Sequence, residues 1–292
     1  MNKLLISTLL ASAMAFPAAA ETLRVGVATA QTGALAPFDT PVIDGIHIAV
    51  DEINAAGGIL GRPVTLEIAD DASGAARAQK AFDSLVYQHE VDVIITMETS
   101  AARNAGLPIV TRGGVPYIYT SFYEGRSCSP WLYVNAWVPE QQVPPVVDQF
   151  MDKEGAKKYF LVGSDYAFGR GMLDFTKKYI ETKGGEVLGE EYLPMDGTDW
   201  TAIISKLKSA NPDALITSTA GGAPNVTLTK QLRAAGVEIP YGNLAVDEGT
   251  ARNMGTDAAG IYISASYITG IDSKENKDFL AAMEKHFGSD LK

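Results

Sequence analysis

The chain has 292 residues, of which 46% are hydrophobic, a formal net charge of −11 at pH 7 and a single cysteine. This length and apolar content favour two domains over one. The net negative charge disfavours binding to nucleic acid or anionic membranes through the electrostatic field of the whole protein. A single cysteine excludes an intrachain disulfide.

The first twenty residues have the pattern of a secretory signal peptide. Lys3 supplies a positive start, residues 4–16 form an apolar run, and Ala18 to Ala20 provide small residues at a cleavage site before Glu21. The apolar run is too short to span a bilayer. We therefore expect residues 1–20 to be removed on export, with an uncleaved anchor as the alternative.

Strand and helix patterns alternate over the next hundred residues. Gly and Pro between residues 31 and 41 predict a loop, after which apolar residues recur at helical spacing from Ile43 and stop at Gly57. Strands are predicted at 23–28, 64–69, 91–96 and 115–120. Further helices are predicted at 75–87 and from Ser100.

Residues 123–145 interrupt this alternation, because they are rich in Pro, Gly, Ser and aromatic residues. We interpret them as a crossing between two lobes. The alternation then resumes with strands at 158–162, 186–192 and 213–218 and short strands near Tyr241 and Ile261. Helices are predicted at 168–183, 200–209, 226–235 and 274–287.

This order of elements predicts an α/β protein with two Rossmann-like lobes, each built on a parallel sheet covered by helices on both faces and joined by a hinge. The first lobe is expected to comprise residues 21–137 and 268–292, and the second residues 138–267. The chain would cross between them near Trp137 and Ser266.

Ligands of open parallel sheets bind beyond the carboxyl ends of the strands, so residues that follow the predicted strands are the candidates for a site. Ser100 and Ser121 can each present a hydroxyl group there. With nearby backbone N–H groups at a helix start, they would attract a carboxylate or carbonyl oxygen. The alternative for Ser100 is a helix N-cap, a role compatible with ligand contact.

Aromatic and acidic residues cluster at the same places. The rings that could wall a pocket belong to Tyr119, Tyr123, Trp137, Tyr166 and Phe168, although each could equally be ordinary core. Glu98 and Glu248 could accept hydrogen bonds from an amide or ammonium group. Glu98 could instead be a solvated charge near Arg103.

Several motifs of known enzymes are absent. The sequence contains neither a Gly-x-Ser-x-Gly elbow nor a phosphate-binding loop, and it lacks His-Glu-x-x-His and paired-Cys metal spacing. Cys128 has no supporting base motif, and we expect a buried or inert thiol. The prediction is a protein that is not an enzyme and uses no metal or cofactor.

One segment resembles a known family. Residues 45–62, which contain Glu-Ile-Asn-Ala-Ala-Gly-Gly-Ile-Leu-Gly-Arg, resemble the start of the type I periplasmic solute-binding proteins of ABC transporters, the leucine/isoleucine/valine-binding family. The resemblance runs from about Leu23 to Gly288. It implies capture of a small solute between two closing lobes, a periplasmic location and permease subunits of the inner membrane as partners.

Shorter motifs resemble the branch of this family that binds urea and short-chain amides. They are Tyr123-Glu124-Gly125, Pro139-Glu140-Gln141-Gln142 and Gly163-Ser164-Asp165-Tyr166. This resemblance places the ligand contacts at Ser100, Tyr119, Ser121, Tyr166 and, as an acidic position, Glu248.

The chain departs from that branch in three respects. Glu98 replaces an aromatic residue, which hints at an amino or cationic group on the ligand, and Phe168 replaces a frequent tyrosine. The chain also stops at Lys292, where similar proteins continue, so the resemblance implies a C-terminal truncation. The alternatives are a binder of branched-chain or other amino acids and, from another class, an amide-sensing regulatory protein.

Overall fold

The structure is a computed structural model that describes residues 21–33 and 35–288. The signal peptide expected at residues 1–20 lies outside the described residues. Within the described ranges, no helix combines the length and the apolar character that crossing a membrane would require.

Two separate sheets of five parallel strands form the frame of the molecule. The first sheet contains β1 (Leu23–Thr29), β2 (Val64–Asp70), β3 (Val93–Met97), β4 (Tyr117–Tyr119) and β5 (Leu132–Val134). The second sheet contains β6 (Lys158–Ser164), β7 (Glu186–Leu193), β8 (Ala214–Ser218), β9 (Tyr241–Asn243) and β10 (Ile261–Tyr262). We call each sheet with the helices that cover it the first and the second lobe.

The two sheets share one topology. The strand order is β2-β1-β3-β4-β5 in the first and, read from its other edge, β7-β6-β8-β9-β10 in the second. Thr29 at the end of β1 pairs with both Asp70 and Met97, so three strands end level with one another. The residues that follow these strands are therefore gathered at one edge of the sheet.

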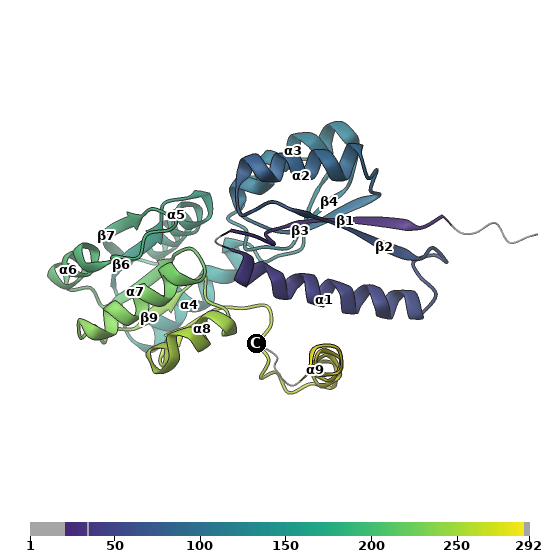
Figure 1. Cartoon of the computed structure of the whole chain (residues 1–292). Helices are drawn as coiled ribbons and strands as arrows, with labels where there is room; N and C mark the ends of the chain where they lie inside the picture. The colour runs from purple at the N-terminus through teal and green to yellow at the C-terminus, as the bar shows by residue number, and fades with distance from the viewer. Residues whose placement is uncertain (1–20, 34, 289–292) are drawn as a thin grey trace, which may run out of the picture.

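Helices cover both faces of the first sheet (Figure 1). On one face lie α2 (Ala75–Tyr87) and α3 (Ser100–Gly113), whose apolar residues pack with Ile94 and Tyr117 of the strands. On the other face lies α1 (Ala36–Ala55), where Ile46, Val50 and Ile53 pack against β1 and β2. Apolar residues that recur at helical spacing thus cover both faces of the first sheet.

The second sheet is covered in the same way. Helices α4 (Pro139–Lys153) and α5 (Ala167–Thr182) pack on one face, and α6 (Thr201–Ala210) and α7 (Ala223–Ala234) pack on the other. Trp200, just before α6, is fully buried in the second of these layers. The chain continues through α8 (Glu248–Met254) and the short 3-10 helix η1 (Gly255–Ala258).

The structure corrects two expectations from the sequence. The first helix begins at Ala36, within the segment predicted as a loop, since Pro41 removes only one main-chain hydrogen bond from it. The predicted irregular crossing at 123–145 contains strand β5 and the start of α4. Val143, Val146, Val147 and Phe150 form a buried face on α4, which compensates for two prolines inside the helix.

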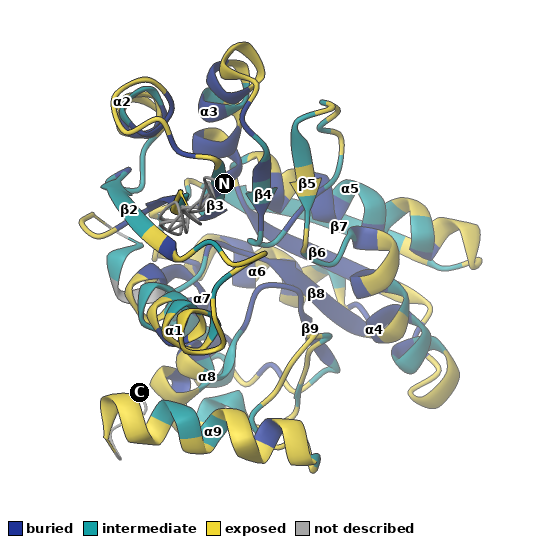
Figure 2. Ribbon diagram, turned by 90° about the vertical axis from the view of Figure 1, so that its right-hand side faces the viewer, coloured by how far each residue is buried: buried dark blue, intermediate teal, exposed yellow. Residues whose placement is uncertain are grey.

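The last helix is α9 (Lys274–Phe287). It lies beside α1, far in sequence from it, and most of its surface is exposed (Figure 2). The Ser273 hydroxyl caps it by accepting a hydrogen bond from the Asn276 N–H at 3.1 Å. The lobe boundaries near Trp137 and Ser266 stay a prediction.

Candidate ligand-binding site

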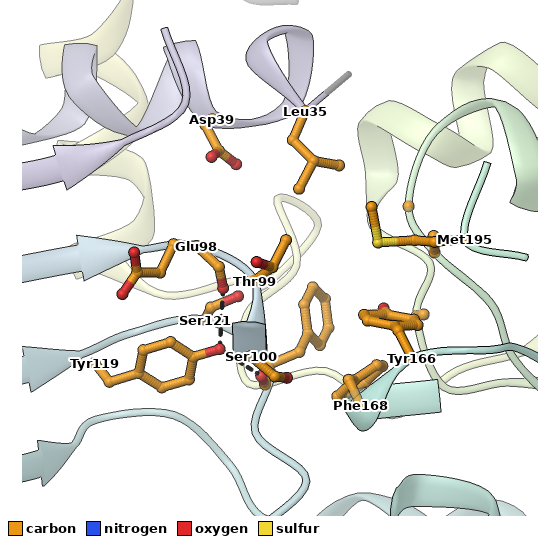
Figure 3. Close-up of a pocket in the computed structure, with 14 residues that line it drawn as sticks. Leu35, Asp39, Glu98, Thr99, Ser100, Tyr119, Ser121, Tyr166, Phe168 and Met195 are labelled. Atoms are coloured by element: carbon orange, nitrogen blue, oxygen red, sulfur yellow. Dashed lines mark hydrogen bonds between the residues drawn. The ribbon is translucent and has the colours of Figure 1, made fainter. Parts of the chain in front are cut away.

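A small cavity of about 60 Å³ lies between the two sheets. Figure 3 shows residues of the first lobe on one side and Met195, Tyr166 and Phe168 of the second lobe on the other. The cavity is lined by Leu35, Asp39, Glu98, Thr99, Ser100, Tyr119, Ser121, Phe122, Tyr166, Phe168, Met195, Ala220, Gly221 and Ala245.

The strand order explains why a cavity forms here. The chain leaves the first sheet in opposite directions after β1 and β3. The first turn of α1, which follows β1, supplies Asp39, and the loop after β3 supplies Glu98. In the second sheet, β6 and β8 form the corresponding pair, and they are followed by Tyr166 and Ala220. Ligands of open α/β sheets bind at such switch points, and here two switch points face each other.

Ser100 lies at the first position of α3 and is 2% exposed. The residue that caps this helix is Thr99, whose hydroxyl accepts from the Ala102 N–H at 3.1 Å, so Ser100 is not the cap. The Ser100 hydroxyl instead donates to Glu124 Oε2 at 3.0 Å. Arg103 holds the same carboxylate through a 2.6 Å bond to Oε1 and a 3.2 Å bond to Oε2.

Tyr119 and Ser121 bring the end of β4 to the cavity. The Tyr119 hydroxyl lies 3.0 Å from the carbonyl oxygen of Glu98 and 3.2 Å from that of Phe122. Burial raises the pKa of Tyr119 above its ordinary value, so its phenol stays protonated and donates to these carbonyls. Ser121 is half-buried at the cavity wall and presents its hydroxyl beside Tyr119 (Figure 3).

Asp39 is a buried carboxyl group in the first turn of α1. Its Oδ2 accepts from the Ala30 N–H at 3.1 Å and from the Thr29 hydroxyl at 3.2 Å. Burial raises the pKa of Asp39 to about 7. The hydrogen bond from Ala30 lowers it in part, and the neighbouring charge of Asp71 acts in the same direction as burial. The cavity therefore contains a carboxyl group that titrates near neutral pH.

Glu98 directs its carboxyl group away from the cavity and into the first lobe (Figure 3). The Tyr117 hydroxyl donates to Oε1, while Oε2 is buried without a partner among the described residues. Burial raises the pKa of Glu98 well above its ordinary value, and the charge of Asp71 acts in the same direction. The neutral form is favoured, as expected for a carboxyl group taken out of water.

Aromatic rings close the other side of the cavity. Phe168 lies 5.8 Å from Phe122 and 6.0 Å from Tyr166, measured between ring centroids. Trp137 packs edge-on against Phe122 at 5.2 Å but does not line the cavity, and neither does Tyr123. Of the five aromatic residues predicted to wall a pocket, the structure brings three to it: Tyr119, Tyr166 and Phe168.

Two other predicted positions lie elsewhere. Glu248 does not line the cavity, because its two carboxylate oxygens accept from the Thr269 N–H at 2.9 Å and the Thr269 hydroxyl at 2.7 Å. Its role as a ligand contact stays a prediction. Cys128, expected to be buried or inert, is exposed.

The structure thus brings Glu98, Ser100, Tyr119, Ser121 and Tyr166 together and leaves Glu248 outside. Sequence reasoning missed Asp39 and Met195, and it named Glu124 only as part of the Tyr123-Glu124-Gly125 motif. Asp39 lies in a segment that was predicted as a loop, and Met195 follows the end of β7, a strand end that could have been searched.

Neutral hydroxyls, carboxyls and rings in a small cavity can hold a polar solute through hydrogen bonds. Among residues 21–33 and 35–288, no cluster of His, Cys, Asp and Glu could hold a metal ion.

Comparison with known proteins agrees with this arrangement. Residues 22–291 match the family model described as a periplasmic binding protein. The Leu/Ile/Val-binding protein BraC3 of Rhizobium johnstonii is 32% identical over 298 residues, which cover 96% of this chain and 78% of that protein. The leucine-, isoleucine-, valine-, threonine- and alanine-binding protein of Pseudomonas aeruginosa is 26% identical, over 100% of this chain and 74% of that protein.

Solved structures have the same fold. The branched-chain amino acid transporter substrate-binding protein LivJ from Streptococcus pneumoniae, in complex with isoleucine, superposes with a TM-score of 0.77 at 26% identity, over 91% of this chain and 78% of that chain. A solute-binding protein from Rhodopseudomonas palustris BisB5 gives 0.80 at 24% identity, over 91% of this chain and 74% of that chain. The predicted α/β class with two parallel-sheet lobes is confirmed. The chain belongs to the periplasmic binding protein family, in its type I, Leu/Ile/Val-binding-like group.

Proposed function

We propose that this chain is the solute-binding component of an ABC transporter and that it captures a small polar solute, a short-chain amide or a urea-like molecule, between its lobes. The observation that carries the proposal is the cavity itself. Hydroxyl and carboxyl groups of the first lobe form its polar side, and aromatic rings cover the opposite side. Closure of two lobes about a hinge removes water and strengthens such polar contacts.

The size of the cavity favours a small solute. Its volume of about 60 Å³ is less than half the roughly 150 Å³ of an engineered apolar cavity that binds benzene. A molecule the size of acetamide or urea fits this space better than one with a branched aliphatic side chain. Ser100, Tyr119, Ser121 and Tyr166 are the residues that we expect to contact it.

A branched-chain amino acid is the second candidate, because BraC3 is a relative at 32% identity. Such a ligand would need a wider separation of the lobes, which a hinge motion can supply. Its ammonium group would also need an acidic partner, for which Glu98 and Glu248 are the candidates.

The cellular setting follows from the same proposal. Residues 1–20 would direct the chain through the inner membrane into the periplasm and be cleaved. The mature protein would then deliver its solute to the permease subunits of the transporter.

A thermal-shift panel tests the proposed solute class, because a ligand that binds only the native state raises the melting temperature. The panel contains acetamide, propionamide, urea, leucine and acetate, with urea kept at low concentration because it also denatures proteins. We expect acetamide to raise the melting temperature and leucine to leave it unchanged. A rise with leucine and none with the amides would overturn the proposal.

A further inference from the structure

Glu124 lies directly behind the cavity and does not line it. It belongs to the loop after β4 and is 7% exposed. Its Oε2 accepts hydrogen bonds from the Ser100 hydroxyl at 3.0 Å and from Arg103 Nη1 at 3.2 Å, and its Oε1 accepts from Arg103 Nη2 at 2.6 Å. Ser100 is thus the link between this buried carboxylate and the cavity.

Arg103 fixes the charge state of this arrangement. It is 1% exposed, and its guanidinium carbon lies 4.9 Å and 5.0 Å from the ring centroids of Tyr119 and Tyr123. Its two-point contact with Glu124 has the geometry of a bidentate ion pair. The positive charge and the two donated hydrogen bonds of Arg103 match a carboxylate, an acceptor-only group, beside Ser100.

The direction of the Ser100 hydrogen bond follows from this charge. An ionised carboxylate can only accept hydrogen bonds, so the Ser100 hydroxyl must donate its single proton to Glu124. The lone pairs of the Ser100 oxygen then remain for the cavity. Tyr119 is in the same condition, because its proton lies between two backbone carbonyls that can also only accept.

We propose that Glu124 is a positioning residue that turns the Ser100 hydroxyl into a hydrogen-bond acceptor and so selects a solute with N–H groups over its carboxylate counterpart. The inference rests on the proposed function and names the recognising chemistry. An amide NH₂ can donate to the Ser100 and Tyr119 oxygens. A carboxylate of the same shape would place an acceptor against acceptors, and buried polar groups left unpaired in this way strongly reduce affinity.

Acetamide and acetate are the matched probes, since they differ only in NH₂ against O⁻. We expect the chain to bind acetamide at least about 100-fold more tightly than acetate in calorimetric titration, in line with sites that reject a ligand lacking their hydrogen-bond partner. Equal affinities would overturn the role of Ser100 as an acceptor.

Glu124→Gln tests the positioning role itself. The amide oxygen of Gln can keep accepting from Arg103, while its NH₂ donates to the Ser100 oxygen and turns the serine proton toward the cavity. We expect acetamide affinity to fall and acetate affinity to rise, so that their ratio drops at least about tenfold. If Glu124 served only folding, the substitution would lower the affinities for both probes alike and leave their ratio unchanged. That result would refute the proposal.

Two further variants serve as controls. Glu190→Gln changes a partly buried carboxylate of β7 that binds Lys177 and Tyr192, and it should leave the ratio unchanged. Glu124→Asp keeps an acceptor-only group, so it should preserve more of the preference for acetamide than Glu124→Gln. Failure of Glu124→Asp to do so would count against the proposal even if both variants melt at lower temperature.

A neutron structure of the perdeuterated protein separates this inference from the proposed solute. We expect the deuteron on the Ser100 oxygen to lie on the line to Glu124 Oε2. A deuteron directed into the cavity would overturn the inference whatever the chain binds. A deuteron on that line, combined with no binding of acetamide, would refute the proposed solute and support the role of Glu124.

Discussion

Gly171 of α5 packs directly against Glu124 of the first lobe. A Cβ built on Gly171 would stand 2.8 Å from the Glu124 Cβ and 2.9 Å from its Cγ, closer than packed carbon atoms approach. The same glutamate holds Ser100 and Arg103. The absence of a side chain at residue 171 therefore lets the second lobe support the residues behind the cavity.

Gly171→Ala is expected to destabilise the chain and weaken solute binding, because an added methyl group must push α5 and Glu124 apart. Overpacking of this kind costs about 1–3 kcal/mol in the free energy of unfolding. Acetamide affinity should fall about tenfold if the displacement reaches Ser100, in line with the loss of a hydrogen bond. Guanidinium chloride denaturation and calorimetry measure the two effects.

Gly45→Ala is the matched control for this prediction. Gly45 also lies inside a helix, but a Cβ built there meets nothing within 4 Å. Replacing a glycine by alanine at such a place should stabilise the chain by up to about 1 kcal/mol. Equal effects of the two substitutions would show that the contact with Glu124 is unimportant.

Asp39 should make stability depend on pH. Its pKa is raised from 3.8 to about 7, so over this interval the folded chain holds a proton that the unfolded chain has released. The contribution of this group to the free energy of unfolding is therefore complete below pH 3.8. It decreases by about 1.4 kcal/mol per pH unit as the pH rises to about 7. Above that pH the contribution of the group is constant.

Asp39→Asn tests this prediction because asparagine keeps an oxygen that can accept from Ala30 and Thr29. The difference in unfolding free energy between the variant and the original chain should grow as the pH rises from about 4 to about 7. Asp51→Asn, at an exposed position of the same helix, is the control and should leave the slope unchanged. A slope that survives Asp39→Asn would assign the titration to other groups.

Glu98→Gln separates two roles of Glu98. If its carboxyl serves only the buried contact with Tyr117, the neutral amide can replace it, and acetamide affinity should change less than about threefold. A loss of tenfold or more would place the carboxyl group in contact with the solute. Glu98→Ala should cost about 1–3 kcal/mol in stability, since it leaves the Tyr117 hydroxyl buried without its acceptor.

The periodic patterns predicted the strands and most helices because burial on two faces imposes them directly on the sequence. Two of the failures came from prolines. Pro144 and Pro145 concealed a helical spacing that Val143, Val146, Val147 and Phe150 carry plainly, and Pro41 delayed the predicted start of α1. In both places, packing of an apolar face outweighs the local cost of a proline.

Residues of the candidate site could be predicted only where they follow a strand, because ligands of open parallel sheets bind beyond the strand ends. Ser100, Tyr119, Ser121 and Tyr166 follow from that rule together with the family resemblance, and their ligand contacts stay predictions. Glu124 could not be assigned, because its bonds to Ser100 and Arg103 join residues more than twenty positions apart. Such pairings arise from the packing of α3 against the loop after β4, which no local pattern encodes.

Ser121→Ala combined with Tyr166→Ala should remove most of the affinity for acetamide. The first substitution deletes a hydroxyl at the cavity wall, and the second deletes a ring that covers it. Loss of one hydrogen bond and one aromatic contact corresponds to about 1–3 kcal/mol, or roughly 5- to 150-fold in affinity. An unchanged dissociation constant in calorimetry would exclude this cavity as the binding site.

The most direct test is a crystal structure of the chain grown with acetamide. We expect one molecule between the two lobes, with its NH₂ group toward the Ser100 and Tyr119 oxygens and with Tyr166 and Phe168 over it. Acetamide bound elsewhere, or a cavity that stays without it at saturating concentration, would contradict the claim that this chain holds a short-chain amide between its lobes.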